Sequence, residues 1–141
     1  MLIPVWAFLL LGYYRAGGER FYFNTKFILI FIIYSILAAS VYILNQITDI
    51  RSDTINRKHL LLAEGILSKR DAYMEIAVLL IMVIILSFFL NFHFLFFIAV
   101  SFIMGIIYSV PPFKFKDRPI LDFLINAIGY GFIFLVLPPS S

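Results

Sequence analysis

Residues 27–44 read FILIFIIYSILAASVYIL, a continuous run without a charged side chain. Such a run, as a helix, approaches the roughly 20 apolar residues needed to cross the hydrocarbon core of a bilayer. Across all 141 residues, 63% of the side chains are hydrophobic and only 13% are charged, and the mean hydropathy is +1.03. A soluble domain could not bury that much apolar surface. The composition therefore predicts an integral membrane protein.

Comparable apolar runs lie on both sides of this one. We expect an all-α fold, a polytopic transmembrane helical bundle with about five spans in one membrane domain over residues 1–141. The expected spans lie near residues 2–14, 27–47, 72–90, 94–108 and 121–137. The first is short enough to be the core of a signal peptide, but it lacks a basic start, so we favour a shortened helix. The link at residues 91–93 is so brief that the helices beside it should be antiparallel.

Positive charge is divided unevenly between the two ends of such a bundle. Alternating five helices across the bilayer places the loops 47–71 and 109–120 at one membrane face. These loops contain Arg51, Arg57, Lys58, Lys69, Arg70, Lys114, Lys116 and Arg118. The other face has only Arg15, Arg20 and Lys26. The positive-inside rule then predicts that both loops are cytoplasmic, and we expect the cell (inner) membrane as the location.

The polar residues exclude several classes of protein. A net charge of +3 is too small to suggest binding of nucleic acid, and the absence of cysteine excludes disulfides, thiolate catalysis and Cys-based zinc sites. His59 and His93 have no partners at metal-ligand spacing, so we expect interfacial side chains and not ligands. The chemistry must therefore come from oxygen-bearing and basic groups.

Oxygen-bearing side chains recur every four residues where the second apolar run ends. They are Asn45, Asp49 and Asp53. On a helix, positions four apart advance by about 40° around the axis and about 6 Å along it, so the three side chains share one face. Such a face suits Mg²⁺, which takes one or two carboxylates together with phosphate oxygens and water. The pattern therefore favours a diphosphate as the ligand, bound through Mg²⁺.

A plainer interpretation of the same residues stays open. Asp49 and Asp53 could lie in a solvated loop beyond the helix, paired with Arg51 or Arg57. Asn45 favours the metal site, because a polar group one turn deeper, among apolar neighbours, is costly and often functional. Its structural alternative is a hydrogen bond between packed helices.

A second polar segment, YSVPPFKFK, covers residues 108–116. The two prolines end the fourth helix, and Lys114 and Lys116 would point the same way if the chain after them is extended. With Arg118, these lysines could neutralise a departing diphosphate at the same membrane face as the Asp stripe. The alternative is that the prolines only terminate the helix and the basic residues contact anionic lipid. Tyr108 could stabilise a carbocation or belong to the ordinary aromatic belt.

The two segments together resemble the UbiA superfamily of membrane prenyltransferases. The resemblance covers roughly residues 45–126 and includes NRK at residues 56–58 and EGILS at residues 64–68. It implies a bundle of about nine spans that transfers an isoprenoid group from a polyprenyl diphosphate to a lipophilic acceptor, using Mg²⁺ at two Asp-rich motifs. The first motif corresponds to Asn45, Asp49 and Asp53, which are then the catalytic and metal-binding candidates. The candidates for diphosphate binding are Tyr108, Lys114, Lys116 and Arg118.

The sequence departs from the family pattern in two places. No second Asp-rich motif follows Asp122, so we expect roughly the front half of such an enzyme, which could be inactive alone. The family often carries Arg-Pro where this chain reads HLLLAE at residues 59–64, which leaves the acceptor open among aromatic compounds, quinone precursors and isoprenoid or carotenoid lipids. Asp122 and Asn126, one turn apart, could approach the site or bond neighbouring helices.

A rival function belongs to a different class. In a membrane carrier or assembly protein, the Asp stripe would bind a transported cation and the basic loop would contact lipid. Such a protein should carry ionisable groups near the middle of the membrane, and the best apolar runs have none. The expected partners are therefore a polyprenyl diphosphate, a lipophilic acceptor and the lipid bilayer, and the sequence does not indicate an oligomeric state.

Overall fold

A computed structural model describes residues 2–16, 24–90, 92–117, 120 and 124. Every regular element in this part of the chain is helical: α1 (Leu2–Ala16), α2 (Thr25–Ile55), α3 (Lys69–Ser87), α4 (Phe92–Ser109) and a short 3-10 helix, η1 (Phe115–Asp117). The predicted all-α class is therefore confirmed for the described residues. The helices cover four of the five expected spans, whereas the fifth, residues 121–137, lies outside the described residues apart from Leu124.

Helix α2 is much longer than the apolar run that predicted it. Its 31 residues span about 46 Å at 1.5 Å per residue, which exceeds the roughly 30 Å of a hydrocarbon core. Asn24 caps its beginning, where the Asn24 side chain accepts a hydrogen bond of 2.8 Å from the Phe27 amide. Within the described residues, α2 is long and apolar enough to cross a membrane, and α4 contributes the shorter apolar stretch Phe94–Ser109. The last turns of α2 therefore extend past its apolar part.

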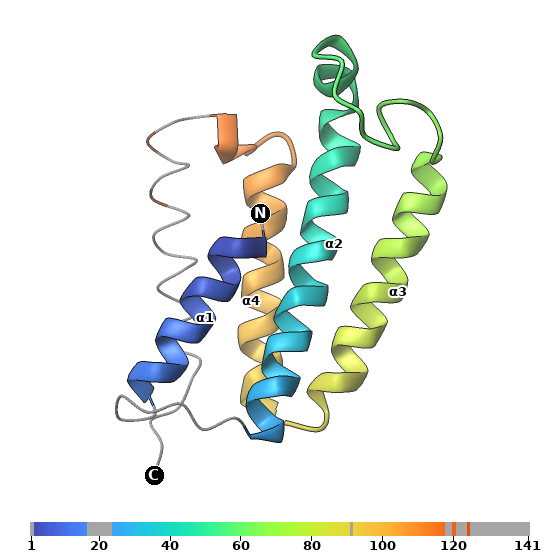
Figure 1. Cartoon of the computed structure of the whole chain (residues 1–141). Coiled ribbons are helices and arrows are strands. Elements are labelled where there is room, and N and C mark those ends of the chain that lie inside the picture. Colours follow the sequence, from blue (N-terminus) through green and yellow to red (C-terminus); the bar gives the residue numbers. More distant parts are fainter. Residues whose placement is uncertain (1, 17–23, 91, 118–119, 121–123, 125–141) are drawn as a thin grey trace.

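The core forms around α2, which lies between α3 and α4 and also packs against α1 (Figure 1). Ile33 and Leu37 of α2 are buried against Leu9, Val83 and Ile98 from the other three helices. A close approach of α2 and α4 is set by Gly105, because a Cβ atom added there would lie 2.6 Å from Cγ2 of Val41. Helices α3 and α4 run in opposite directions, as the brief link at residues 91–93 predicts.

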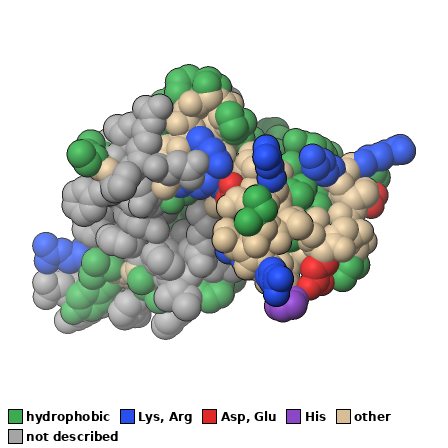
Figure 2. Space-filling model, turned by 90° about the horizontal axis from the view of Figure 1, so that it is seen from above, with side chains coloured by type: hydrophobic (Ala, Val, Ile, Leu, Met, Phe, Trp, Pro, Cys, Tyr) green, Lys and Arg blue, Asp and Glu red, His purple; other side chains and the backbone are tan. Residues whose placement is uncertain are grey.

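Both polar loops, residues 56–68 and 110–114, lie at one end of the bundle, together with η1 (Figure 1). We call this the loop end. Leu62 of the first loop is buried against Ile47, Ala72 and Ile76, which fixes the loop onto α2 and α3. Figure 2 views the molecule from the loop end and shows Lys and Arg side chains gathered there around a few acidic ones. Arg15 and Lys26 lie at the opposite end, so the charge asymmetry of the sequence is preserved among the basic residues that the structure describes.

Candidate functional site

Asn45, Asp49 and Asp53 all lie within α2, in the turns that extend past its apolar part. The solvated-loop alternative is therefore wrong for both carboxylates, because the helix continues to Ile55. The Asp49 side chain is 22% exposed and the Asp53 side chain only 6% exposed. Helical geometry thus presents three oxygen-bearing groups in a partly buried row.

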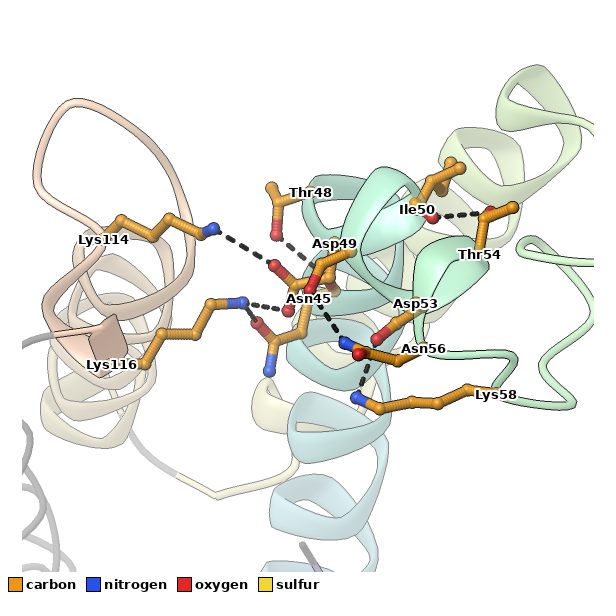
Figure 3. A network of polar contacts seen from close by, with 11 residues as sticks. Asn45, Thr48, Asp49, Ile50, Asp53, Thr54, Asn56, Lys58, Lys114 and Lys116 are labelled. Atoms are coloured by element: carbon orange, nitrogen blue, oxygen red, sulfur yellow. Dashed lines mark hydrogen bonds and ion pairs between the residues drawn. The ribbon is translucent and has the colours of Figure 1, made fainter.

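Asn45 and Asp49 are contacted by two lysines that lie far away in the sequence. Lys116 Nζ donates hydrogen bonds both to Asn45 Oδ1 and to Asp49 Oδ2, and Lys114 Nζ lies 3.3 Å from Asp49 Oδ1 (Figure 3). The Lys116 side chain is 12% exposed and the Lys114 side chain 28% exposed. Two lysines from the segment after α4 therefore meet the Asn45–Asp49 pair, and we call these four residues the cation cluster.

A turn, and not an extended strand, brings the two lysines to Asp49. The amide of Lys114 donates to the carbonyl oxygen of Val110 at 3.0 Å, and residues 115–117 form η1. Lys114 itself has a φ of 37°, an uncommon left-handed conformation for a residue with a side chain. The segment is therefore not extended, which was the condition under which the sequence had both lysines point the same way, yet both side chains still converge on one carboxylate.

Asp53 has a different and local partner. Its Oδ1 atom lies 2.7 Å from Lys58 Nζ, and its carbonyl oxygen accepts a 3.0 Å hydrogen bond from the Lys58 amide. The hydrogen bond with the Asp53 carboxylate raises the pKa of Lys58. In Figure 3, Lys58 reaches the helix from the side opposite Lys114 and Lys116. Asp53 therefore pairs with neither Arg51 nor Arg57, the partners that the plainer interpretation proposed.

Sequence reasoning used Lys58 to orient the chain and as part of the NRK segment of the family resemblance, but it missed the contact of Lys58 with Asp53. The signal available was its position five residues after Asp53, just beyond the end of a helix. Arg57, with a φ of 50°, turns the chain back between them. Only the backbone path decides that Lys58, and not Arg57, meets the carboxylate.

Six other residues were singled out in the sequence, and the structure describes some of them. Tyr108 is partly buried in the last turn of α4, whereas Arg118, Asp122 and Asn126 lie outside the described residues. The His59 side chain is 91% exposed, and its Nδ1 atom lies 2.7 Å from Glu64 Oε1. The side chain of His93 also lies outside the described part of the chain.

The cation cluster fits a magnesium ion that shares its coordination with a substrate. Among the described residues, no group of three or more His, Asp or Glu side chains could hold a metal by itself. Asn45 Oδ1 and Asp49 Oδ2 nevertheless converge on a single cationic atom, Lys116 Nζ. Two protein oxygens plus phosphate oxygens and water are a typical Mg²⁺ environment in phosphate sites. The Asp53 carboxylate, by contrast, is directed toward Lys58.

Comparisons with known proteins identify the family of this chain. The UbiA prenyltransferase family model matches residues 2–137. A probable homogentisate phytyltransferase 2, chloroplastic, of Oryza sativa subsp. japonica is 34% identical over 93 residues, which are 64% of this chain and 24% of the rice protein. The chain thus spans about a quarter of the length of that curated relative. No solved structure matches the chain.

Proposed function

We propose that this chain, which belongs to the UbiA prenyltransferase family, binds the diphosphate of an isoprenoid donor at its cation cluster for Mg²⁺-dependent prenyl transfer. The family is one of polytopic membrane transferases. The observation that carries the proposal is the convergence of Asn45, Asp49, Lys114 and Lys116 at the loop end. A carboxylate for a metal ion and two ammonium groups for phosphate oxygens are the parts that diphosphate release needs.

Each residue of the cluster has a distinct role in this proposal. Asn45 and Asp49 would hold the Mg²⁺ ion, and Asp53 would support it from the next turn through water or after exchanging its contact with Lys58. Bound there, Mg²⁺ supplies Lewis-acid stabilisation of negative charge on the diphosphate. Lys114 and Lys116 would donate hydrogen bonds to phosphate oxygens as the C–O bond of the donor breaks. Tyr108 and Arg118 stay further candidates for binding the diphosphate.

The bond that breaks leaves an allylic cation on the isoprenoid, and the acceptor attacks it. Electrons of the C–O bond depart with the diphosphate, so positive groups that face the diphosphate lower the barrier of this step. The similarity to a probable homogentisate phytyltransferase of rice supports an aromatic acceptor of the homogentisate type and a phytyl donor. The exposed apolar side chains of α3, such as Val78, Ile81 and Ile85, support a bilayer setting in which a lipophilic donor is dissolved.

The membrane domain over residues 1–141 is proposed to be part of a larger bundle of the family type. The comparison with the rice relative, of which 24% is covered, supports this. In such a bundle, the loop end would face the cytoplasm, because the basic residues gather there. A second Asp-rich motif would complete the metal site from the remaining helices.

The proposal is tested by equilibrium binding of a non-hydrolysable geranylgeranyl diphosphate analogue to the purified chain in lipid nanodiscs, with and without Mg²⁺. We expect Mg²⁺-dependent binding that is lost in Asp49→Asn, which preserves the shape of the side chain and removes its charge. Glu75→Gln is the matched control, since Glu75 is an exposed carboxylate on α3 away from the cluster. Equal binding by the wild type and Asp49→Asn would refute the proposed role of the cluster. Cation flux without binding of the analogue would favour a carrier instead.

A further inference from the structure

We propose that Lys116, assisted by Lys114, acts as an internal occupant of the metal site that must leave before Mg²⁺ can bind. The inference rests on the proposed function and adds a regulatory step to it. In the chain without substrate, Asn45 and Asp49 are closed to Mg²⁺ alone by their contacts with Lys116. The oxygen atoms of Asn45 and Asp49 become available to Mg²⁺ when Lys116 moves to a bound diphosphate. Metal and diphosphate are therefore expected to bind as a coupled pair.

Lys116 and a metal ion would compete for the same oxygen atoms. Lys116 Nζ contacts Asn45 Oδ1 and Asp49 Oδ2, which are the two oxygens assigned to Mg²⁺. Lys114 Nζ approaches the second oxygen of the same carboxylate, at 3.3 Å from Oδ1. Both oxygens of Asp49 are thus already engaged by cations. A divalent ion in the same place would repel the ammonium groups strongly at such short separations.

The contact between Lys116 and Asp49 is partly shielded from water. The Lys116 side chain is 12% exposed and that of Asp49 22% exposed, whereas Lys58 in the neighbouring pair is 57% exposed. A partly buried pair is screened less by salt and water than a surface pair, so it resists displacement by a hydrated ion. Mg²⁺ also gives up its hydration water reluctantly, which makes it a weak competitor when it arrives alone.

Lys114 and Lys116 can move from Asp49 to another anionic partner. Lys114 lies in the short link between α4 and η1, and Lys116 lies within the three-residue η1. Each ammonium group is carried on a flexible four-carbon stem and has three donors. The φ of 37° at Lys114 shows that this segment is held in an uncommon backbone conformation while the contacts with Asp49 exist. A diphosphate at the cluster would supply several anionic oxygens, so the lysines could exchange Asp49 for phosphate without losing a charged partner.

The exchange predicts opposite effects of one substitution on two ligands. Lys116→Met removes the ammonium group and keeps an unbranched side chain of similar length. It should raise the affinity for a metal ion alone, because the competitor is gone, and lower the affinity for the diphosphate, because a donor is gone. Coupling between bound groups commonly amounts to about 5- to 150-fold, so we expect shifts on the order of tenfold in each direction.

The experiment measures Mn²⁺ binding by electron paramagnetic resonance, with Mn²⁺ as the probe for Mg²⁺, on the full chain without any diphosphate. The geranylgeranyl diphosphate analogue is then titrated at saturating Mg²⁺. The variants are Lys116→Met, Lys114→Met and the control Lys69→Met, an exposed lysine at the loop end. We expect tighter Mn²⁺ binding in Lys116→Met, a smaller gain in Lys114→Met, and no change in Lys69→Met. Circular dichroism reports folding, and if Lys116→Met does not fold, Lys114→Met decides.

The outcomes separate this inference from the function on which it rests. If the wild type binds the analogue through Asp49 but neither lysine variant binds Mn²⁺ more tightly than the wild type, the internal-occupant inference is wrong and the proposed function stands. If the wild type does not bind the analogue in a Mg²⁺-dependent way, the proposed function fails and the inference fails with it. Opposite shifts of the two affinities in Lys116→Met would support both.

Discussion

Two carboxylates one helical turn apart on α2 have contrasting surroundings. Asp49 is joined to Lys114 and Lys116, more than sixty residues away in the chain, across the boundary between α2 and the segment after α4. Asp53 is joined to Lys58, five residues away, in a contact that closes the end of its own helix. Asp53 is nevertheless the more buried of the two side chains, at 6% against 22%.

Burial alone would favour Asp53 as the functional carboxylate, whereas the proposed site centres on Asp49. Asp53 holds the loop 56–68 against the end of α2, through both its side chain and its carbonyl oxygen. Asp49 instead receives groups from a second polar segment, so it is where the two segments that resemble the family pattern meet. The proposed function therefore relies on the long-range contact that joins two polar segments, and not on burial. We expect substitutions to separate the binding role of Asp49 from the local role of Asp53.

The largest effect on ligand binding is expected from Asp49→Asn. Hydrogen bonds to charged groups contribute about 1.5–3 kcal/mol, which corresponds to about a 10- to 100-fold loss of affinity for the diphosphate analogue at saturating Mg²⁺. Asp53→Asn should lose less affinity, because its carboxylate is directed toward Lys58. Instead, it should speed amide hydrogen exchange at Lys58, whose amide bonds to the Asp53 carbonyl oxygen. Isothermal titration and mass-detected exchange on both variants provide the comparison, and equal losses of affinity would contradict it.

A substitution that pushes α4 away from α2 should disturb the Lys116–Asp49 contact and leave the Lys58–Asp53 contact unchanged. In Gly105→Ala, the new Cβ would meet Cγ2 of Val41 at 2.6 Å and Cγ1 at 3.0 Å, and the branched valine has little freedom to move away. Overpacking of this kind costs about 1–3 kcal/mol of stability. Because it forces α4 away from α2, Lys116 should shift relative to Asp49 while Lys58 stays with Asp53. Thermal unfolding should show the loss of stability, and analogue binding should fall several-fold.

The matched control for this substitution is Ala99→Gly, at an exposed position of the same helix. It weakens the helix without adding volume at the contact with α2. A fall in analogue binding in the control as large as that in Gly105→Ala would mean that helix stability, and not the spacing of α2 and α4, governs the site.

The Lys58–Asp53 pair should show its own dependence on pH. The hydrogen bond with Asp53 raises the pKa of Lys58. A raised pKa of a lysine means that the contribution of the pair to the free energy of unfolding is fully present below the ordinary Lys pKa of about 10.4. That contribution is lost as the pH rises through the raised pKa. Thermal unfolding of the wild type and Lys58→Met between pH 8 and pH 11.5 should differ by a constant amount at first and then converge. A difference that grows with rising pH would contradict the assignment.

The smallest effect is expected from His59→Gln. The imidazole is 91% exposed and contacts Glu64, which belongs to neither carboxylate pair. Substitutions at such surface positions usually stay within about 0.5 kcal/mol. Binding of the analogue should therefore change by less than about twofold. A large loss in the same titration would mean that the loop 56–68 contacts the ligand directly.

The sequence predicted the elements more reliably than the contacts between them. The apolar runs predicted four helices now seen in the described residues, because uninterrupted hydrophobicity and the spanning length leave few alternatives. The spacing of Asn45, Asp49 and Asp53 predicted a shared helical face, since that depends only on the period of the helix. Hydropathy alone ended this span near residue 47 and left a loop open for Asp49 and Asp53, because the last turns of α2, which continues to Ile55, are polar.

The spacing of residues in the sequence could not predict which lysines contact Asp49 and Asp53. Lys116 meets Asp49 because Gly105 lets α4 approach α2 and because the segment after the prolines turns into η1. Lys58 meets Asp53 because Arg57 adopts a left-handed conformation. Each depends on backbone geometry that charge and periodicity do not encode. The metal and diphosphate roles of these residues stay predictions that binding experiments must test.

The most direct test of the proposed site asks whether one metal ion contacts both Asp49 and the diphosphate. Mn²⁺ bound to the chain with the geranylgeranyl diphosphate analogue would be studied by electron–nuclear double resonance, which detects phosphorus nuclei in contact with the metal. We predict a strong ³¹P coupling in the wild type and in Glu75→Gln and its loss from protein-bound Mn²⁺ in Asp49→Asn. A ³¹P-coupled, protein-bound Mn²⁺ signal of equal size in Asp49→Asn would contradict the proposed metal site.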